Sequence, residues 1–419
     1  MKDTALYQQL LGIESPWRVS SVDLSIAQKR VVVEVELKPQ VWADPTDPTR
    51  RAHINGWTDR QWRHLDSCGF ETLIRARVPQ LKYASGRVEE LAVAWAERYA
   101  RITRAMEGFV LALLAACPSM KRVCELTGLD WHTVNKVMLR GVERGIKRRA
   151  AEPIVNLGID EKATERGHSY ATILSDCDRS RVLDVVPGRK LESAEQILGT
   201  LTPEQRHGVK AIAMDMWPAY MSAAKRLLDN AEIVHDKFHV AKYLNEAVDA
   251  VRKQEHRELM QARGESVLSG SKWAWMKGYP DGRSSEAVAF RELKTMNLAT
   301  SRAWAYKDSF AKFWDYHSRR GAKHYFDAWG KSVMRSRLEP LKKVVRMMRR
   351  HEAGLTSYAV HRITNACAEG FNSAIQLIKA NARGFRNFDN YRARILFHCG
   401  RLDVGVLSKM ARSITVHFT

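Results

Sequence analysis

The sequence has few cysteines and no long apolar run, and each absence argues against a class of protein. Its 419 residues include six cysteines, none in a C-x-x-C pair and none in a regular pattern. This spacing argues against a disulfide-rich secreted domain and predicts reduced, largely buried thiols. No apolar stretch reaches the ~18–20 residues of a membrane span, and the first residues do not resemble a signal peptide. We therefore expect a cytoplasmic protein with no membrane partner.

Acidic residues are scarce relative to basic ones. There are 68 Lys and Arg against 47 Asp and Glu, which gives a net charge of +21. A compact monomer with such a surplus repels itself unless a polyanion is bound, so the charge favours a nucleic-acid partner. A merely basic soluble protein and a membrane-surface binder stay open on charge alone. With 45% hydrophobic residues the chain can bury cores, and its length suits two or three domains.

Repeats and low-complexity tracts are also absent, and the hydrophobic pattern divides the chain into four parts. Residues 17–38 alternate apolar and polar side chains, which predicts a small β-rich module over 1–100, with a proline-containing loop at 39–48. Residues 101–150 have a helical period. Residues 151–250 and 353–405 form an α/β domain in this interpretation, interrupted by a basic helical insertion over 251–352.

The helical part has the outline of a helix-turn-helix. A helix near 119–126 ends at Gly128, and the next begins near Trp131 and carries polar residues in its first turns. The second helix of such a pair enters the major groove, and its N-terminal side chains meet base edges. Many small three-helix bundles share this outline, and they are the alternative. The basic run that ends at Arg148 and Arg149 favours the interpretation that this part binds DNA.

The order of elements in the α/β part is typical of a ribonuclease-H-like core. We expect helices at 193–201, with Ser193 as the N-cap, and at 218–228, with Pro218 in the first turn. Three strands come first, and then helices alternate with two more strands. The expected strands are 154–160, 170–175, 182–186, 209–214 and 232–235.

Carboxylates follow two of the apolar strands. Asp160 and Asp215 each close an apolar run, and in this fold the two strands are adjacent and parallel, so both carboxylates emerge at one sheet edge. A third acid, Glu369, opens a polar stripe with Asn372 and Lys379 on a predicted helix. Convergent carboxylates suit a pair of Mg²⁺ or Mn²⁺ ions, which catalyse phosphoryl transfer. The alternative is that these three acids lie near the ends of elements by chance, because the chain has 47 acidic residues.

The chain resembles bacterial insertion-sequence transposases of the ISL-three family. The matching motifs are GIDE (158–161), DMWPAY (215–220), DKFHVAK (236–242), NACAEGFNS (365–373), GFRN (384–387) and YRARILF (391–397), together with 6–17 and 62–68. The resemblance implies a DDE triad of Asp160, Asp215 and Glu369. It also implies an active site for DNA cleavage and strand transfer, in a bacterial protein associated with the nucleoid.

Two further features concern the resemblance. Asp236 and His239 match a D-x-x-H signature of related transposases, in which Asp236 would orient His239 near a phosphate; a purely structural pair at a helix start is the alternative. Family members usually carry an N-terminal zinc module with paired cysteines. Segments 41–48 and 78–85 contain no cysteine, so we expect no structural zinc, because such sites need four ligands.

The sequence therefore predicts a transposase that binds the terminal inverted repeats of its element and target DNA, as a homo-oligomer on DNA. A non-catalytic DNA-binding regulator and a stand-alone nuclease are the other candidates. Asn372, Asp236 and His239 are the expected auxiliary residues. The residues expected at the DNA are Trp131, His132, Thr133, Asn135, Lys136, Arg148, Arg149, Lys379 and Arg386.

Overall fold

The computed structural model divides the chain into two compact units. We call them the N-terminal unit, Met1–Gly145 with Asp403–Thr419, and the C-terminal unit, Ile146–Leu402. The structure describes residues 3–44, 47–149, 152–164, 169–276, 285–296, 298–364, 366–382, 384–385 and 387–405. No helix in this described part is long and apolar enough to cross a membrane.

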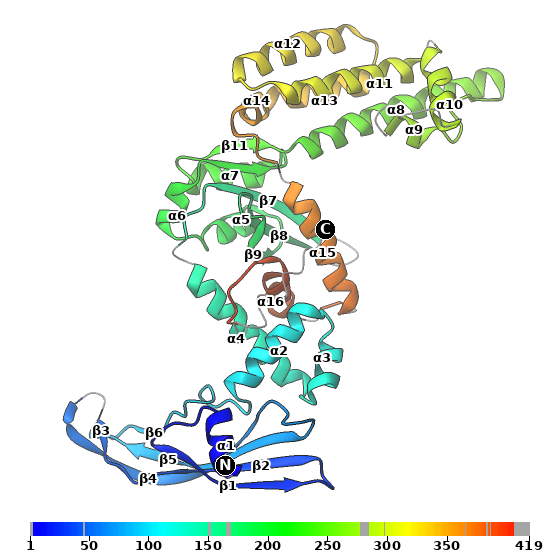
Figure 1. Ribbon diagram of the computed structural model, residues 1–419. Coiled ribbons are helices and arrows are strands. Elements are labelled where there is room, and N and C mark those ends of the chain that lie inside the picture. Colours follow the sequence, from blue (N-terminus) through cyan, green and yellow to red (C-terminus); the bar gives the residue numbers. More distant parts are fainter. Residues whose placement is uncertain are drawn as a thin grey trace. The chain divides into compact units, whose positions relative to one another are not determined.

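The N-terminal unit begins with a six-stranded sheet (Figure 1). Its strand order is β1-β2-β5-β4-β3, with β6 on β5; β2 and β5 are parallel and the other pairs antiparallel. The elements are α1 (Asp3–Leu10), β1 (Trp17–Ser25), β2 (Arg30–Leu37), β3 (Trp42–Asp44), β4 (Asp47–Arg63), β5 (Glu71–Lys82) and β6 (Val88–Glu90). The predicted β-rich module is present, but β3 and the start of β4 occupy the segment expected to be a loop.

Three tryptophans form the centre of this module. The ring of Trp95 packs edge-on against Trp17 at 5.2 Å and against Trp62 at 5.4 Å between centroids. All three are buried. Edge-to-face aromatic pairs of this kind contribute about 0.5–1.5 kcal/mol beyond the burial of their area.

Three helices follow: α2 (Arg104–Ala116), α3 (Met120–Thr127) and α4 (Trp131–Arg149), whose last residues, from Ile146 on, belong to the C-terminal unit. Ser119 caps α3, and Gly128 ends it with φ of 68°, a left-handed conformation that costs glycine little. The carboxylate of Asp130 then accepts from the backbone N–H of Thr133 at 3.0 Å, which caps α4. Short helix, glycine turn and long helix follow the predicted order.

The C-terminal unit is built on a five-stranded sheet of order β11-β10-β7-β8-β9. Strands β7, β8 and β9 form an antiparallel meander, and β10 lies parallel to both β7 and β11. The strands are β7 (Asn156–Ala163), β8 (Tyr170–Asp176), β9 (Arg181–Pro187), β10 (Ala211–Met214) and β11 (Glu232–His235). All five strands lie within three residues of their predicted limits.

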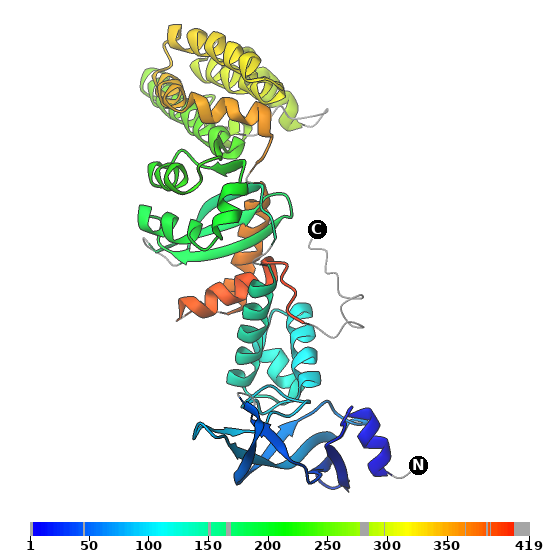
Figure 2. The same ribbon diagram turned by 90° about the vertical axis from the view of Figure 1, so that its left-hand side faces the viewer.

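Helices pack on the sheet and extend beyond it (Figures 1 and 2). A core of α5 and α7 side chains covers the face of Leu157, Ile212 and Met214. Ala211 and Ala213 face the other way and join a core built from the later helices. The helices are α5 (Leu191–Leu198), α6 (Pro203–Gly208), α7 (Pro218–Leu227), α8 (Lys237–Arg263), α9 (Lys272–Met276), α10 (Ser285–Thr295), α11 (Ala299–Phe310), α12 (Arg319–Arg335), α13 (Glu339–Arg350), α14 (Glu352–His361), α15 (Ala366–Asn381) and α16 (Phe388–Cys399), with a 3-10 turn at Ala311–Asp315.

Two predictions about helix starts have different outcomes. Pro218 opens α7 as expected. Ser193 is not the N-cap of α5, because that helix begins at Leu191 with Lys190 in the cap position. The Ser193 hydroxyl instead donates to the carbonyl of Pro187 at 2.8 Å, and so ties the helix to the end of β9.

Candidate active site and nucleic-acid interface

The first two predicted carboxylates lie on neighbouring parallel strands. Ala213 of β10 is opposite Gly158 of β7, and two residues further along come Asp215 and Asp160. Because side chains alternate between the faces of a sheet, this spacing directs both carboxylates to the face of Ala213, on strands about 4.8 Å apart. That face is the one opposite to α5 and α7.

Side chains from two helices hold these carboxylates. The Tyr243 hydroxyl of α8 donates to both carboxylate oxygens of Asp215, at 3.0 and 3.1 Å. The Asn372 amide of α15 donates to Asp160 Oδ2 at 3.1 Å. Burial raises the pKa of Asp160 above its usual range, while hydrogen bonds from the Glu161 N–H and from Asn372 lower it. Segments far apart in the sequence thus meet at one edge of the sheet.

Glu161 is a further carboxylate at this edge, and our sequence prediction did not include it. Burial raises its pKa, and the charges of Asp160 and Asp215 raise it further. Glu161 follows Asp160 directly in β7, so its side chain is directed to the opposite face of the sheet and adds negative charge to this edge without joining the face of Asp160 and Asp215. The GIDE motif contains Glu161, but only the fold shows that its charge reaches Asp215.

An arginine held between two aromatic rings balances part of this charge. The Arg189 guanidinium lies 3.7 Å from Glu161, 3.9 Å from the centre of the Tyr170 ring and 5.4 Å from that of Trp217. The indole N–H of Trp217 donates to the Arg189 carbonyl at 3.1 Å. Cation–π contacts and an ion pair together fix this arginine beside the carboxylates.

The predicted auxiliary pair also lies at this edge. The imidazole Nδ1 of His239 and the carboxylate of Asp236 are 3.2 Å apart. Burial lowers the pKa of His239, but Asp236, Asp215 and Asp160 raise it more, so the net shift is upward. Asp236 occupies the N-cap position of α8 but makes no capping bond with its side chain, which disfavours a role limited to starting the helix.

The remaining predicted residues of this site are less fully described. Glu369 lies in α15, three residues before Asn372, but its side chain is outside the described part of the structure. Arg386 lies outside the described residues altogether, and Lys379 is half-buried in α15. Among the side chains that are described, no three His, Cys, Asp or Glu come together in a group that could hold a metal.

The predicted DNA-reading residues of α4 divide between surface and core. Trp131, His132 and Lys136 are exposed, as a reading role requires. Asn135 is only 8% exposed, so its prediction as a base-reading residue is wrong, because a buried side chain cannot reach a base edge. The Thr133 hydroxyl donates to Asp130 at 2.7 Å and is therefore engaged in the helix cap.

The end of α4 shows the same division. Arg148 is exposed, but Arg149 is 9% exposed and donates to the carbonyls of Val182 at 3.0 Å, Gly400 at 3.3 Å and Leu183. Arg149 is therefore not the phosphate contact that we predicted. It satisfies carbonyl groups of β9 and of the turn after α16.

The arginines between these two ends bind a buried carboxylate. Glu107 of α2 is buried, and it pairs with Arg140 at 2.6 Å and Arg144 at 2.8 Å. Buried charges of this kind need partners. The two arginines thus hold α4 against α2.

Comparison with known proteins agrees with this geometry. A family model described as a transposase (DDE_Tnp_ISL3) matches residues 157–395, more than half of the chain. The chain belongs to the ISL3 (ISL-three) family of transposases. A helix-turn-helix domain of the same family matches residues 91–142.

Two curated relatives support the same conclusion. The transposase for insertion sequence element IS1001 of Bordetella parapertussis is 28% identical over 311 residues, which cover 74% of this chain and 76% of the relative. The transposase for insertion sequence element IS1557 of Mycobacterium tuberculosis is 24% identical over 421 residues, which cover 92% of this chain and 93% of the relative. The protein is thus a DNA transposase of an insertion sequence, and the predicted function is confirmed.

The expectation of no structural zinc is contradicted. A model described as the zinc-finger of transposase IS204/IS1001/IS1096/IS1165 matches residues 40–83 of this transposase, which contain β3, β4 and β5. The described side chains of this stretch do not fit a zinc site. Cys68 is exposed, and the half-buried imidazole of His64 makes a 2.9 Å hydrogen bond to Thr103. The carboxylate of Asp44 accepts from the Ala84 N–H at 2.9 Å and so links the two cysteine-free segments, 41–48 and 78–85.

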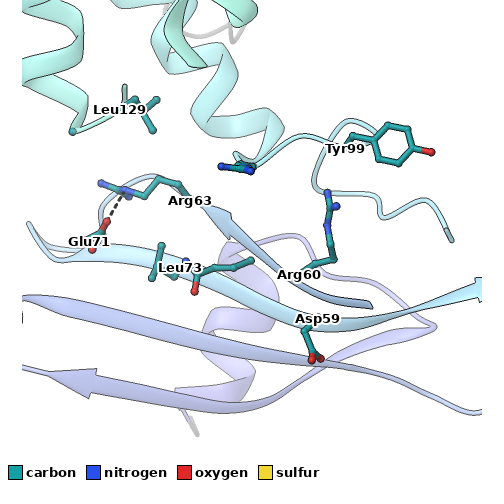
Figure 3. Close-up of a pocket in the computed structure, with 10 residues that line it drawn as sticks. Asp59, Arg60, Arg63, Glu71, Leu73, Tyr99 and Leu129 are labelled. Carbon is teal, nitrogen blue, oxygen red and sulfur yellow. Dashed lines mark ion pairs between the residues drawn. The ribbon is translucent and has the colours of Figure 1, made fainter. Parts of the chain in front are cut away.

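A pocket of about 570 Å³ lies between the sheet of the N-terminal unit and the turn of the helix-turn-helix (Figure 3). Arg60 and Arg63 come from β4, and Leu129 from the turn before α4. Arg63 is 3.5 Å from Glu71, and Arg60 is 3.7 Å from Glu90. Ion pairs within the unit thus balance both of these arginines.

Proposed function

We propose that Asp160, Asp215 and Glu369 are the DDE triad of this transposase and that its α/β domain has the ribonuclease-H-like fold. One observation carries the proposal: Asp160 and Asp215 occupy matching positions on adjacent parallel strands, on the sheet face that α8 and α15 contact. The strand order, an antiparallel meander followed by two parallel strands, is the order expected of that fold.

The triad is suited to Mg²⁺ or Mn²⁺, because its ligands are hard oxygens. Two ions bound there would polarise the attacking oxygen and stabilise the leaving one. The residues of the chain orient this site: Tyr243 fixes Asp215, Asn372 fixes Asp160, and Asp236 orients His239 toward the phosphates. Arg189 and Glu161 complete the charged edge.

The N-terminal unit would recognise the terminal inverted repeats of the element. The side chains of α4 that face solvent, Trp131, His132 and Lys136, are the candidate base-reading residues, and Arg148 is a candidate phosphate contact. Lys379 and Arg386 are further candidate DNA contacts. Two element ends must be joined to one target, which favours a homo-oligomer on DNA, acting at the bacterial nucleoid.

The domain limits of our sequence interpretation remain part of the proposal. The helix-turn-helix would span 101–150, and the catalytic domain 151–250 and 353–405. The helical insertion of 251–352 would continue directly from the catalytic domain, because α8 crosses residue 250 without a break.

Alanine variants of the triad test the proposal. Asp160→Ala, Asp215→Ala and Glu369→Ala should each abolish nicking of an end-containing duplex with Mg²⁺ and leave gel-shift affinity nearly unchanged. Asp229→Ala, an exposed carboxylate after α7, is the matched control and should keep both activities. If one of these triad variants cleaves at the wild-type rate, the substituted residue is not a metal ligand. A wild-type protein that binds ends but never cleaves them would favour a DNA-binding regulator, and one that cleaves without joining would favour a nuclease.

A further inference from the structure

Strand β11 anchors both ends of the helical region that runs from α8 to α14. Helix α8 begins directly after β11, and α14, on which the chain returns, packs against the same strand (Figure 1). Val234 of β11 shares a core with Leu355 of α14. The Glu232 carboxylate accepts from the Ser357 hydroxyl at 3.3 Å, and it is 2.9 Å from the imidazole Nε2 of His361. Apolar packing and hydrogen bonds thus hold α14 on the strand from which α8 departs.

Gly354 of α14 makes a very close approach to the last residue of this strand. A Cβ atom added at Gly354 would lie 2.5 Å from Cδ2 and 2.6 Å from Nε2 of His235. Carbon atoms in contact are about 3.5–4.0 Å apart, so a larger residue would push the two elements apart by roughly 1 Å. The backbone of Gly354 is helical, and helices favour alanine over glycine. The close approach, and not an unusual φ, is therefore what requires glycine here.

The His235 ring has little room to turn away from α14. His235 is buried, with 2% of its surface exposed. The ring of His351 packs edge-on against it, with 5.3 Å between the centroids, and His351 itself lies at the junction of α13 and α14. A side chain added at Gly354 would therefore displace β11 from α14.

A displacement of β11 would reach Asp215 by two short routes. His235 is opposite Met214 of β10, the residue before Asp215. The Asp236 N–H donates to the Met214 carbonyl at 3.1 Å, and Asp236 occupies the N-cap position of α8. The Tyr243 hydroxyl of that helix donates to both carboxylate oxygens of Asp215. The packing of α14 on His235 thus sets where the first turns of α8 stand relative to Asp215.

We propose that Gly354 is a positioning residue for DNA cleavage: its contact with His235 places the first turns of α8 so that Tyr243 reaches Asp215. The proposal rests on the catalytic site proposed above. A displacement of about 1 Å in an active site can slow a reaction by about 100-fold. Because Gly354 itself is buried, a substitution there should change the rate of the chemical step and not the affinity for DNA.

Substitutions on both sides of the contact test this role. Gly354→Ala should lower the single-turnover rate of cleavage at saturating end-containing DNA by about 100-fold, with the Kd for DNA unchanged. His235→Ala removes the ring that the new methyl group would meet, so the double variant should recover most of this loss. Gly330→Ala in α12 is the matched control and should cleave at the wild-type rate, because a Cβ at that buried glycine would lie 3.4 Å from Val345, an ordinary contact distance.

Two results would overturn the proposal: wild-type cleavage by Gly354→Ala, and a double variant as slow as Gly354→Ala alone. Denaturant unfolding shows whether each variant is folded. If Gly354→Ala does not fold, the double variant decides the question. A folded double variant that cleaves at nearly the wild-type rate supports the contact, and an unfolded one overturns it.

Hydrogen exchange provides a readout that is independent of cleavage. In Gly354→Ala the backbone amides around Tyr243 should exchange faster than in the wild type, because the first turns of α8 lose packing, and in the double variant they should return to the wild-type rate. Unchanged exchange around Tyr243 refutes the proposal even if the triad is correct. Faster exchange there, together with full cleavage by Asp215→Ala, would refute the triad and retain the contact between Gly354 and His235.

Discussion

The sheet edge that carries Asp160 and Asp215 and helix α4 are both rich in polar residues, but they differ in how sequence position translates into exposure. At this edge, Asp160 and Asp215 each come two residues after the paired Gly158 and Ala213, and this spacing in adjacent parallel strands directs both carboxylates to one face. On α4, the neighbours Arg148 and Arg149 face opposite environments, one solvent and the other three backbone carbonyls. A strand end thus fixes the direction of a side chain more firmly than a place on a helix of unknown packing.

The largest effect in this comparison is expected from Arg149→Ala. The substitution leaves buried carbonyls of Val182, Leu183 and Gly400 without their charged donor, so the free energy of unfolding should fall by about 3 kcal/mol or more. Arg148→Ala is the matched control and should leave stability unchanged. It should instead weaken binding to all DNA and reduce the salt dependence by about one unit if it contacts a phosphate. Denaturant unfolding measures the change in stability, and salt titrations measure the change in DNA binding. If the two variants are equally stable, the claim that Arg149 and Arg148 have different roles is wrong.

Asn135 and Lys136 sharpen the comparison within α4. Asn135 is buried, so Asn135→Ala should lower the free energy of unfolding by about 1 kcal/mol and leave the ratio of cognate to random DNA binding unchanged. Lys136→Ala should leave stability unchanged and cost roughly 1–3 kcal/mol of cognate binding if it reads a base. Competition gel shifts at fixed salt measure the ratio. A specificity loss confined to Asn135→Ala would show that α4 is rotated relative to this account.

A smaller effect is expected from Tyr243→Phe at the sheet edge that carries Asp160 and Asp215. The variant loses both hydrogen bonds to Asp215, and bonds to charged groups are strong enough that cleavage should slow by about tenfold. DNA affinity should not change. Tyr306→Phe removes a tyrosine hydroxyl that bonds to Ser332 in the helical insertion, and it should cleave at the wild-type rate. If both variants slow cleavage equally, Tyr243 does not act through Asp215.

These contrasts show which parts of the molecule a sequence can predict. The strands of the C-terminal unit and Pro218 at the start of α7 follow from local pattern, and so does the turn at Gly128. The partners of the carboxylates do not, because Tyr243 and Asn372 reach them only through tertiary packing. The same limit explains why Glu161 and Arg189 were missed and why Asn135 and Arg149 were misplaced: burial is decided by the facing element.

Metal preference tests the central claim, that Asp160 and Asp215 are metal ligands, most directly. Asp160→Cys and Asp215→Cys replace a hard oxygen with a softer thiolate, which binds Mn²⁺ better than Mg²⁺. Cleavage of end-containing DNA is measured with each ion, beside the corresponding alanine variants. Our account predicts that the cysteine variants cleave with Mn²⁺ and not with Mg²⁺, and that the alanine variants cleave with neither. Cysteine variants no more active with Mn²⁺ than with Mg²⁺ would contradict it.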